Sequence, residues 1–212
     1  MNLLHRFAYR VSTWNRTRKW ERFVREIEPG PETKVLDVGY QDLAFFSADN
    51  FIEEHYPWPR QLTALGIEEP VNFSVRYPEV EVITYDGRIF PFEDKSFDVV
   101  WSNAVIEHVG DRDAQLLFLK ECLRVSNRIF VTTPNRFFPV EVHTRIPLLH
   151  WLPKPAFDWI LKRIGKSFFA DDYMTLLGRR QLRRLLIEAG AGDATIIRNR
   201  LFGLSVDFVV IT

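Results

Sequence analysis

Acidic side chains follow three successive apolar stretches of the chain. Asp37 lies near the end of the first stretch, Glu68 follows the second and Asp86 follows the third. If these stretches are parallel strands, their carboxyl ends meet in one crevice, which is where an open α/β sheet binds its ligand. Clustered carboxylates disfavour an anionic cofactor and suit a ligand that carries a sulfonium, an ammonium and a ribose diol. The sequence therefore predicts a site for a cationic nucleoside.

Each residue of this predicted site has its own role. We expect Glu68 to accept hydrogen bonds from both ribose hydroxyls and Asp86 to accept one from the adenine amino group. Asp37 and nearby backbone would hold the amino-acid end of the ligand, although Asp37 could instead only cap the following helix. Gly39 would let the main chain pass close to the ligand. Three further residues at the strand ends complete the predicted site: Tyr40, Gly87 and Asn103.

Alternating strands and helices must position these residues. Short, mostly apolar runs predict five strands, at residues 34–38, 62–67, 81–85, 97–101 and 128–133. A helix at 178–189 precedes two further strands, 194–198 and 206–211, whose connection is too short for a crossover helix, so they must form an antiparallel hairpin. We therefore predict an α/β fold with a Rossmann-like, seven-stranded, mostly parallel sheet, helices on both faces and a C-terminal antiparallel hairpin.

Residues 1–212 are predicted to form a single domain with two additions, because this length suits one hydrophobic core. Helical spacing of apolar residues predicts one or two amphipathic helices within residues 1–30. Residues 134–177 are too long for an ordinary loop, so we expect this insertion to shape the substrate site. Its aromatic side chains either line an acceptor pocket or form a small core of their own; they are Phe137, Phe138, Trp151, Phe157 and Trp159.

Four stretches resemble, in order, the successive motifs of class I S-adenosylmethionine-dependent methyltransferases, especially the branch of the ubiquinone and menaquinone biosynthesis enzymes. They are KVLDVG, LTALGIEE, YDGRIFPFEDKSFDVVWSNAVIEHV and LRVSNRIFVTTPN, within roughly residues 34–135. The resemblance implies that S-adenosylmethionine is the cofactor and that a small-molecule or membrane-associated acceptor is methylated, with O- or C-methylation favoured. In-line displacement of the methyl group depends mainly on alignment, so no dedicated base is obligatory.

The chain departs from the family pattern after its first strand. Family members have further glycines after the position of Gly39, whereas here Tyr40, Gln41 and Asp42 follow. Their backbone amides can still face a ligand if the dihedral angles permit. The missing glycines leave open a catalytically degenerate fold that binds a ligand or partner without turnover. A nucleotide-dependent oxidoreductase is a remote alternative, because the G-x-G-x-x-G spacing it needs is absent.

Two histidines are candidates for a general base if the acceptor is a hydroxyl, namely His108 and His143. In the ubiquinone-pathway relatives a Glu-x-x-Glu-His run can hold a divalent metal. Ala104 stands at the position of the first Glu, ahead of Glu107 and His108, so we favour a site without metal. His143 or His150 would have to replace the lost ligand, and a packed, hydrogen-bonded histidine is the commoner state.

The net charge is zero, with 28 Lys and Arg against 28 Asp and Glu, so no global field attracts nucleic acid or a membrane. Basic clusters in residues 1–25 and 162–184 suit an interfacial helix or an anionic, lipid-linked acceptor, and equally a solvated helix face. No nucleic-acid-binding motif accompanies them. No apolar run reaches the roughly 18 residues that span a bilayer. The single Cys122 fits a reducing compartment, so we expect a cytoplasmic protein and leave open peripheral membrane contact through the basic N-terminal helices.

Overall fold

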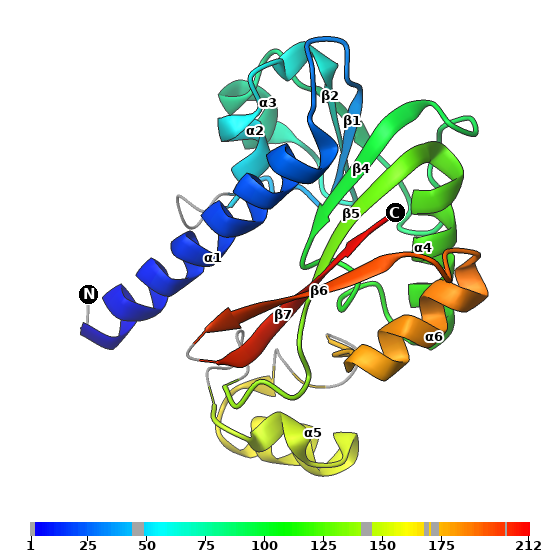
Figure 1. The fold of residues 1–212 in the computed structure, drawn as a ribbon. Coiled ribbons are helices and arrows are strands. Elements are labelled where there is room, and N and C mark those ends of the chain that lie inside the picture. The colour runs from blue at the N-terminus through cyan, green and yellow to red at the C-terminus, as the bar shows by residue number, and fades with distance from the viewer. Residues whose placement is uncertain (1–2, 44–48, 141–145, 168–169, 171–173, 202) are drawn as a thin grey trace. The chain divides into compact units, whose positions relative to one another are not determined.

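The computed structural model describes every residue except 1–2, 44–48, 141–145, 168–169, 171–173 and 202. Seven strands form a sheet in the order β3-β2-β1-β4-β5-β7-β6 (Figure 1). The strands are β1 Val35–Val38, β2 Leu62–Gly66, β3 Glu81–Thr84, β4 Phe97–Asn103, β5 Ser126–Pro134, β6 Thr195–Leu201 and β7 Leu204–Ile211. The helices are α1 Leu3–Ile27, α2 Phe51–His55, α3 Val71–Arg76, α4 Arg112–Val125, α5 Lys154–Arg163 and α6 Arg179–Ala189, with the 3-10 turns η1 Pro59–Gln61 and η2 Leu149–Trp151.

The strand directions confirm the predicted fold class. Strand β1 pairs in parallel with β2 and β4, and β2 pairs in parallel with β3. Strand β7 pairs antiparallel with both β5 and β6. The chain is therefore an α/β protein with a Rossmann-like sheet that ends in an antiparallel hairpin, as its sequence predicts.

Strands β4 and β5 are longer than the apolar runs predict. β4 continues to Asn103, and β5 extends from Ser126 to Pro134. The polar side chains of Ser102 in β4 and of Thr132 and Thr133 in β5 are fully buried. Backbone pairing continues through such residues because it needs only the main-chain donors and acceptors, so a hydrophobic run marks the middle of a strand better than its ends.

The chain divides into two compact units, residues 1–101 with 125–128 and residues 102–124 with 129–212. The first unit contains α1, α2, α3 and strands β1 to β3. Its core includes the ring of Phe23 from α1, which packs edge-on against Trp101 of β4 with ring centroids 5.1 Å apart. Helix α1 is one continuous helix across the segment for which one or two helices are predicted.

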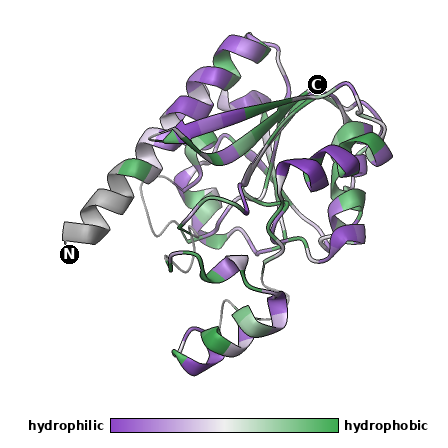
Figure 2. Ribbon diagram, turned by 60° about the horizontal axis from the view of Figure 1, so that its bottom comes forward, coloured by the Kyte–Doolittle hydropathy of each residue, from purple (hydrophilic) through white to green (hydrophobic). Residues whose placement is uncertain are grey.

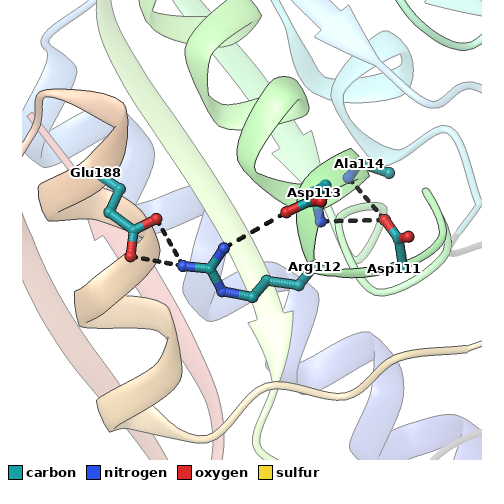
Figure 3. Close-up of polar contacts among 5 residues, drawn as sticks. All are labelled: Asp111, Arg112, Asp113, Ala114 and Glu188. Carbon is teal, nitrogen blue, oxygen red and sulfur yellow. Dashed lines mark hydrogen bonds and ion pairs between the residues drawn. The ribbon is translucent and has the colours of Figure 1, made fainter.

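The second unit contains α4, α5, α6 and the hairpin of β6 and β7. Figure 3 shows how its helices α4 and α6 are linked: Arg112 Nη2 donates to both carboxylate oxygens of Glu188, at 2.5 and 2.6 Å. Asp111 begins α4, because its Oδ1 accepts hydrogen bonds from the backbone amides of Asp113 at 3.1 Å and Ala114 at 3.0 Å. A carboxylate at a helix N-terminus satisfies amides that have no partner within the helix.

Part of the 134–177 insertion has a small core of its own. Phe157 and Leu161 of α5 are buried with Ala170, and Ile146 and Leu149 pack against them. This fits one of the two predicted alternatives for the aromatic residues. The rings of Trp151 and Trp159 are exposed, whereas Phe137 lines a pocket described below.

The strands are mostly apolar, whereas helix α1 is mostly polar. Figure 2 shows apolar residues, in green, along the strands and polar residues, in purple, along most of the coloured part of α1. Among the helices that the structure describes, none is both long enough and apolar enough to cross a membrane.

Candidate functional site

The carboxyl ends of β1, β2 and β3 lie side by side in the first unit. Val38 of β1 is in register with Leu65 of β2, and Gly66 of β2 is in register with Thr84 of β3. The predicted acidic residues lie in or just beyond these ends. Asp37 is buried within β1, whereas Glu68 and Asp86 are exposed, each two residues past the end of its strand. We call these three residues the acidic edge.

Tyr40 takes the place of a glycine in the loop after β1 without filling that loop with its ring. The ring lies over Gly66, where an added Cβ would come within 2.5 Å of Tyr40 Cε1, and it packs on Phe73 with ring centroids 4.7 Å apart. Its hydroxyl donates to the backbone oxygen of Glu68. Tyr40 therefore ties the loop after β1 to the end of β2.

Hydrogen bonds hold the rest of this loop where the family has glycines. The amide of Gln41 donates to Asn50 Oδ1 at 2.9 Å, and Asn50 Nδ2 donates back to the Gln41 oxygen at 2.7 Å. Asp42 Oδ1 accepts from the amides of Asn72 at 2.7 Å and Phe73 at 2.9 Å. The amide of Asp42 donates to Glu68 Oε2 at 3.3 Å, so the same loop also orients the carboxylate of the acidic edge.

The two predicted glycines have the backbone that their role requires. Gly39 and Gly87 have φ angles of 105° and 82°, in the region that favours glycine. An added Cβ on Gly87 would meet Ile67, the residue before Glu68, at 3.5 Å. Beside Gly87, Asp86 Oδ1 accepts from the amide of Arg88 at 2.9 Å, which fixes one carboxylate oxygen. These contacts keep Asp86 and Glu68 at neighbouring strand ends.

Asp37 has a buried carboxylic neighbour that the sequence does not reveal, Glu53 of α2. Burial raises the pKa of Asp37 to about 6. Burial, followed by the charge of Asp37, raises the pKa of Glu53 well above its usual value. Two buried carboxyls that interact in this way resist double ionisation. Glu53 belongs to none of the motifs that predict the site, so the sequence gave no signal of its position beside Asp37.

This arrangement suits a ligand with positive charge. Burial raises the pKa of both Asp37 and Glu53, so a cationic group beside this pair would favour its ionised form. The exposed carboxylate of Glu68 is oriented by the loop and available to a diol. Both features fit the ammonium, sulfonium and ribose groups of S-adenosylmethionine, and they do not fit a pyrophosphate.

Asn103 lies in the second unit, at the end of β4. Its Oδ1 accepts a hydrogen bond from Thr132 Oγ1 of β5 at 2.8 Å. Ala104 follows with a φ of 61°, a left-handed conformation that is rare for alanine. Glu107 is fully buried, and its Oε2 accepts from Thr133 Oγ1 at 3.1 Å. The loop after β4 is thus held against β5 within this unit.

The histidine candidates differ in what the structure shows. His108 is half-buried in a turn in which its amide donates to Val105 O at 2.8 Å. His143 lies outside the described residues. His150 is buried, with Nε2 3.0 Å from Phe138 O, and is thus a packed histidine. Among the residues that the structure describes, no three side chains of His, Cys, Asp or Glu are grouped to hold a metal.

The second unit also contains a pocket of about 420 Å³ that the sequence did not reveal as a site. Residues from separate parts of the chain line it, including three arginines and two phenylalanines. We call it the arginine pocket and define it by Phe137, Gly178, Arg179, Arg180, Arg198 and Phe208. Arg179 and Arg180 belong to the basic cluster at 162–184, but no pattern in the sequence predicts that they lie near Arg198.

The chain is similar in sequence to known methyltransferases. A family model described as "Methyltransferase domain" matches residues 58–128. A probable S-adenosylmethionine-dependent methyltransferase of Mycobacterium tuberculosis is 42% identical over 82 residues, which are 36% of this chain and 29% of that protein. The chain thus matches less than a third of that relative's length. A ubiquinone biosynthesis O-methyltransferase of Parvibaculum lavamentivorans is 25% identical over 95% of this chain and 75% of its own.

The fold has a counterpart among solved structures. The magnesium protoporphyrin IX methyltransferase of Synechocystis, solved with bound SAH, superposes with a TM-score of 0.60 at 13% identity. The match covers 100% of this chain and 87% of that protein. At this identity the similarity concerns the fold alone.

Proposed function

We propose that this chain, which belongs to the class I S-adenosylmethionine-dependent methyltransferases, transfers a methyl group to a small-molecule or membrane-associated acceptor. The observation that carries the proposal is the acidic edge, in which Asp37, Glu68 and Asp86 occupy the ends of neighbouring strands. Their negative charge complements a nucleoside with a positively charged sulfur.

We propose one contact with the cofactor for each predicted site residue. Glu68 receives the ribose hydroxyls, since Asp42 already orients its carboxylate. Asp86 accepts from the adenine amino group, and Asp37 supports the ammonium of the methionine part. Gly39, Tyr40 and Gly87 contribute backbone beside the ligand. Asn103 completes this set as a proposed contact.

Alignment is the main contribution that we assign to the protein. When bound, S-adenosylmethionine supplies a methyl group activated by its sulfonium. The residues around it hold cofactor and acceptor in line and exclude water, which can lower a barrier by on the order of 7 to 11 kcal/mol in the best models. For a hydroxyl acceptor, we propose His108 or His143 as the group that removes the proton.

We propose oxygen or carbon as the methylated atom. The relative that matches most of this chain is named an O-methyltransferase of ubiquinone biosynthesis, which supports oxygen. The test is to incubate the protein with methyl-labelled S-adenosylmethionine and cell lysate, and then to separate lipid, aqueous, protein and RNA fractions. We expect label in a small molecule of the lipid or aqueous fraction. Label confined to protein or RNA would contradict the proposal.

The setting we propose is the cytoplasm, with residues 1–212 acting as one domain and the 134–177 insertion shaping the acceptor side. Helix α1 offers a surface for peripheral membrane contact, because it combines several arginines with the exposed ring of Trp14, over which Arg18 stacks at 4.7 Å. Cosedimentation with anionic vesicles, compared with neutral ones, tests this contact. Equal binding to both would argue against it.

A catalytically degenerate fold is the second candidate, and the loop after β1 motivates it. Tyr40, Gln41 and Asp42 replace the glycines that usually surround the methionine part of the cofactor. In that case S-adenosylmethionine would not bind even at millimolar concentration, or would bind without any methyl transfer. Calorimetry and the labelling experiment together separate these outcomes.

A further inference from the structure

The arginine pocket is assembled from three segments of the second unit. Arg198 of β6 is in register with Phe208 of β7, so both side chains project from the same face of the hairpin. Gly178 precedes α6, and the ring of Phe137 lies on it: an added Cβ would be 2.8 Å from Phe137 Cε2. Arg179 and Arg180 form the start of α6. The absence of a side chain at Gly178 is what lets Phe137 form a wall.

Hydrogen bonds from one residue fix the corner of the pocket where β5 ends. The amide of Asn135 donates to Val206 O at 2.9 Å, and its Nδ2 donates to Ser205 O at 2.8 Å. Its Oδ1 accepts from the amide of Phe137 at 3.1 Å. Asn135 thus joins β5, β7 and the aromatic wall, so the pocket is a built feature of this unit.

Within the part of the chain that the structure describes, the guanidinium groups of the pocket have no acidic partners. Arg179, Arg180 and Arg198 are exposed, and none of them makes an ion pair or hydrogen bond with any residue in the part of the chain that the structure describes. Arg183 on the same helix differs, because it donates to Gly192 O at 3.0 Å and Ala194 O at 2.7 Å. Three guanidinium groups around one pocket repel one another, and an anion would relieve that repulsion.

The size and walls of the pocket define the rest of its ligand. A volume of about 420 Å³ is in the range of small-molecule sites. Phe208 is 2% exposed and Phe137 is 64% exposed, so the pocket has a buried apolar floor and an exposed apolar wall. An apolar body with one anionic group matches this surface.

Within the second unit, the arginine pocket lies beside the carboxyl end of β5. Asn135 directly follows Pro134, the last residue of β5, and ligands of α/β sheets bind at the carboxyl ends of strands. Thr132 of the same strand end holds Asn103, one of the proposed cofactor contacts. Within the second unit, the pocket and Asn103 therefore belong to the same end of β5.

We propose that the arginine pocket binds a monomeric apolar molecule that carries a carboxylate or phosphate, and that this molecule is the methyl acceptor. Only the identification of the ligand as the acceptor rests on the proposed function. Arg179, Arg180 and Arg198 bind the anionic group, while Phe137 and Phe208 contact the apolar body.

Calorimetry with decanoate, decyl phosphate and decanol, each below its micelle concentration or solubility limit, tests the binding step. The variants are Arg179→Gln combined with Arg198→Gln, and Arg184→Gln as a matched control, since Arg184 is an exposed arginine of α6 outside the pocket. Losing charged hydrogen bonds should weaken binding of the two anions by about tenfold or more in the double variant. The control should bind them as the wild type does, and decanol should bind weakly to all three proteins.

Three results would overturn the inference. The control variant could lose as much affinity as the double variant, which would mean diffuse charge attraction. Decanol could bind as tightly as decanoate, which would remove the anionic group from the recognition. Binding confined to phosphatidylglycerol vesicles would make the surface a membrane contact instead of a pocket for a monomer. Equal thermal midpoints for the variants and the wild type establish that the fold is intact.

Measurements of S-adenosylmethionine binding and methyl transfer separate this inference from the proposed function. The double variant should bind the cofactor as the wild type does but should need a higher acceptor concentration for half-maximal methyl transfer. Cofactor binding with unchanged acceptor use would refute the acceptor assignment alone. Decanoate binding in the pocket without any cofactor binding to the wild type would refute the proposed function and leave the anion pocket intact.

Discussion

The acidic edge of the first unit and the arginine pocket of the second are built in opposite ways. The acidic edge consists of residues at the ends of successive strands, and one of them, Asp37, is buried beside a second carboxyl. The arginine pocket brings together exposed arginines and two phenylalanines from three distant segments. Under the proposed function, the cofactor is recognised through short motifs in the chain, whereas the acceptor is recognised through an assembled surface. This difference explains why the sequence indicates the cofactor and is silent on the acceptor.

The two regions also differ in how their charged groups affect the stability of the folded protein. Burial of Asp37 and Glu53 opposes their ionisation, so negative charge on this pair destabilises the folded protein at neutral pH. The arginines of the pocket are exposed to solvent. Substitutions in the acidic edge should therefore change both stability and cofactor affinity, whereas substitutions in the pocket should change affinity alone.

The largest effect is expected from Asp37→Asn. The pKa of Asp37 is about 6 in the folded protein, against about 3.9 for an unfolded aspartate. The folded state thus holds this proton more tightly, and the free energy of unfolding falls as pH rises from about 4 to about 6. The neutral variant escapes that loss, so at pH 8 it should be more stable than the wild type by up to roughly 3 kcal/mol.

Urea denaturation at pH 4 and pH 8 measures this difference. The stability gain should appear at pH 8 and nearly vanish at pH 4, while affinity for S-adenosylmethionine at pH 8 falls. Glu53→Gln is the companion variant, because it removes the neighbouring carboxyl and leaves Asp37 in place. A stability difference independent of pH would show that Asp37 does not titrate as described.

A second prediction concerns the packing of Tyr40 on Gly66. Gly66→Ala places a Cβ about 2.5 Å from the buried Tyr40 ring, which cannot move without disturbing Phe73. Overpacking of this kind should destabilise the protein by about 1 to 3 kcal/mol. It should also weaken cofactor binding, because the loop that orients Glu68 shifts. Thermal unfolding and calorimetry measure the two effects.

Gly192→Ala is the matched control in the second unit. Its Cβ would meet Ile187 at an ordinary 3.5 Å, so stability should change little. The double variant Gly66→Ala, Tyr40→Ala should lose less than the sum of the single variants, because the clash requires both side chains. Additive losses would mean that Tyr40 does not lie on Gly66.

The smallest effect is expected at the start of α4. Asp111→Ala removes the acceptor for two backbone amides (Figure 3) and should lower the free energy of unfolding by about 1 kcal/mol. Neither cofactor nor anion binding should change, since Asp111 belongs to neither site. Asp113→Ala serves as the control because its carboxylate accepts none of these amide bonds. A matching loss in the control would contradict the capping role of Asp111.

The sequence predicted the fold because each of its signals is local. Apolar runs of four to six residues indicate buried parallel strands, and the short link between the last two strands permits only a hairpin. The comparisons likewise confirm the resemblance to class I methyltransferases, and with it S-adenosylmethionine as the family's cofactor. The residues assigned to the acidic edge stay predictions, although the strand ends meet as expected.

Other features depend on tertiary contacts that no local pattern encodes. Glu53 of α2 interacts with Asp37 of β1, although no sequence motif pairs the two residues. Arg198 of β6 lines the same pocket as Arg179 and Arg180 of α6, together with Phe208 of the paired strand β7. Hydrogen bonds from Asn50 and Asp42 replace the glycines of the loop after β1, and their partners are distant in sequence. Charge and periodicity identify such residues without indicating which of them meet.

Calorimetric titration of S-adenosylmethionine into the wild type, Glu68→Ala and Glu69→Ala tests the acidic edge most directly. Glu69 is the adjacent exposed carboxylate and keeps the net charge of the two variants equal. The wild type and Glu69→Ala should bind the cofactor equally, and Glu68→Ala should bind it more weakly by about 1.5 to 3 kcal/mol, the scale of a lost hydrogen bond to a charged group. An unchanged dissociation constant for Glu68→Ala, or no binding to the wild type at millimolar cofactor, would contradict the assignment of this edge to the cofactor.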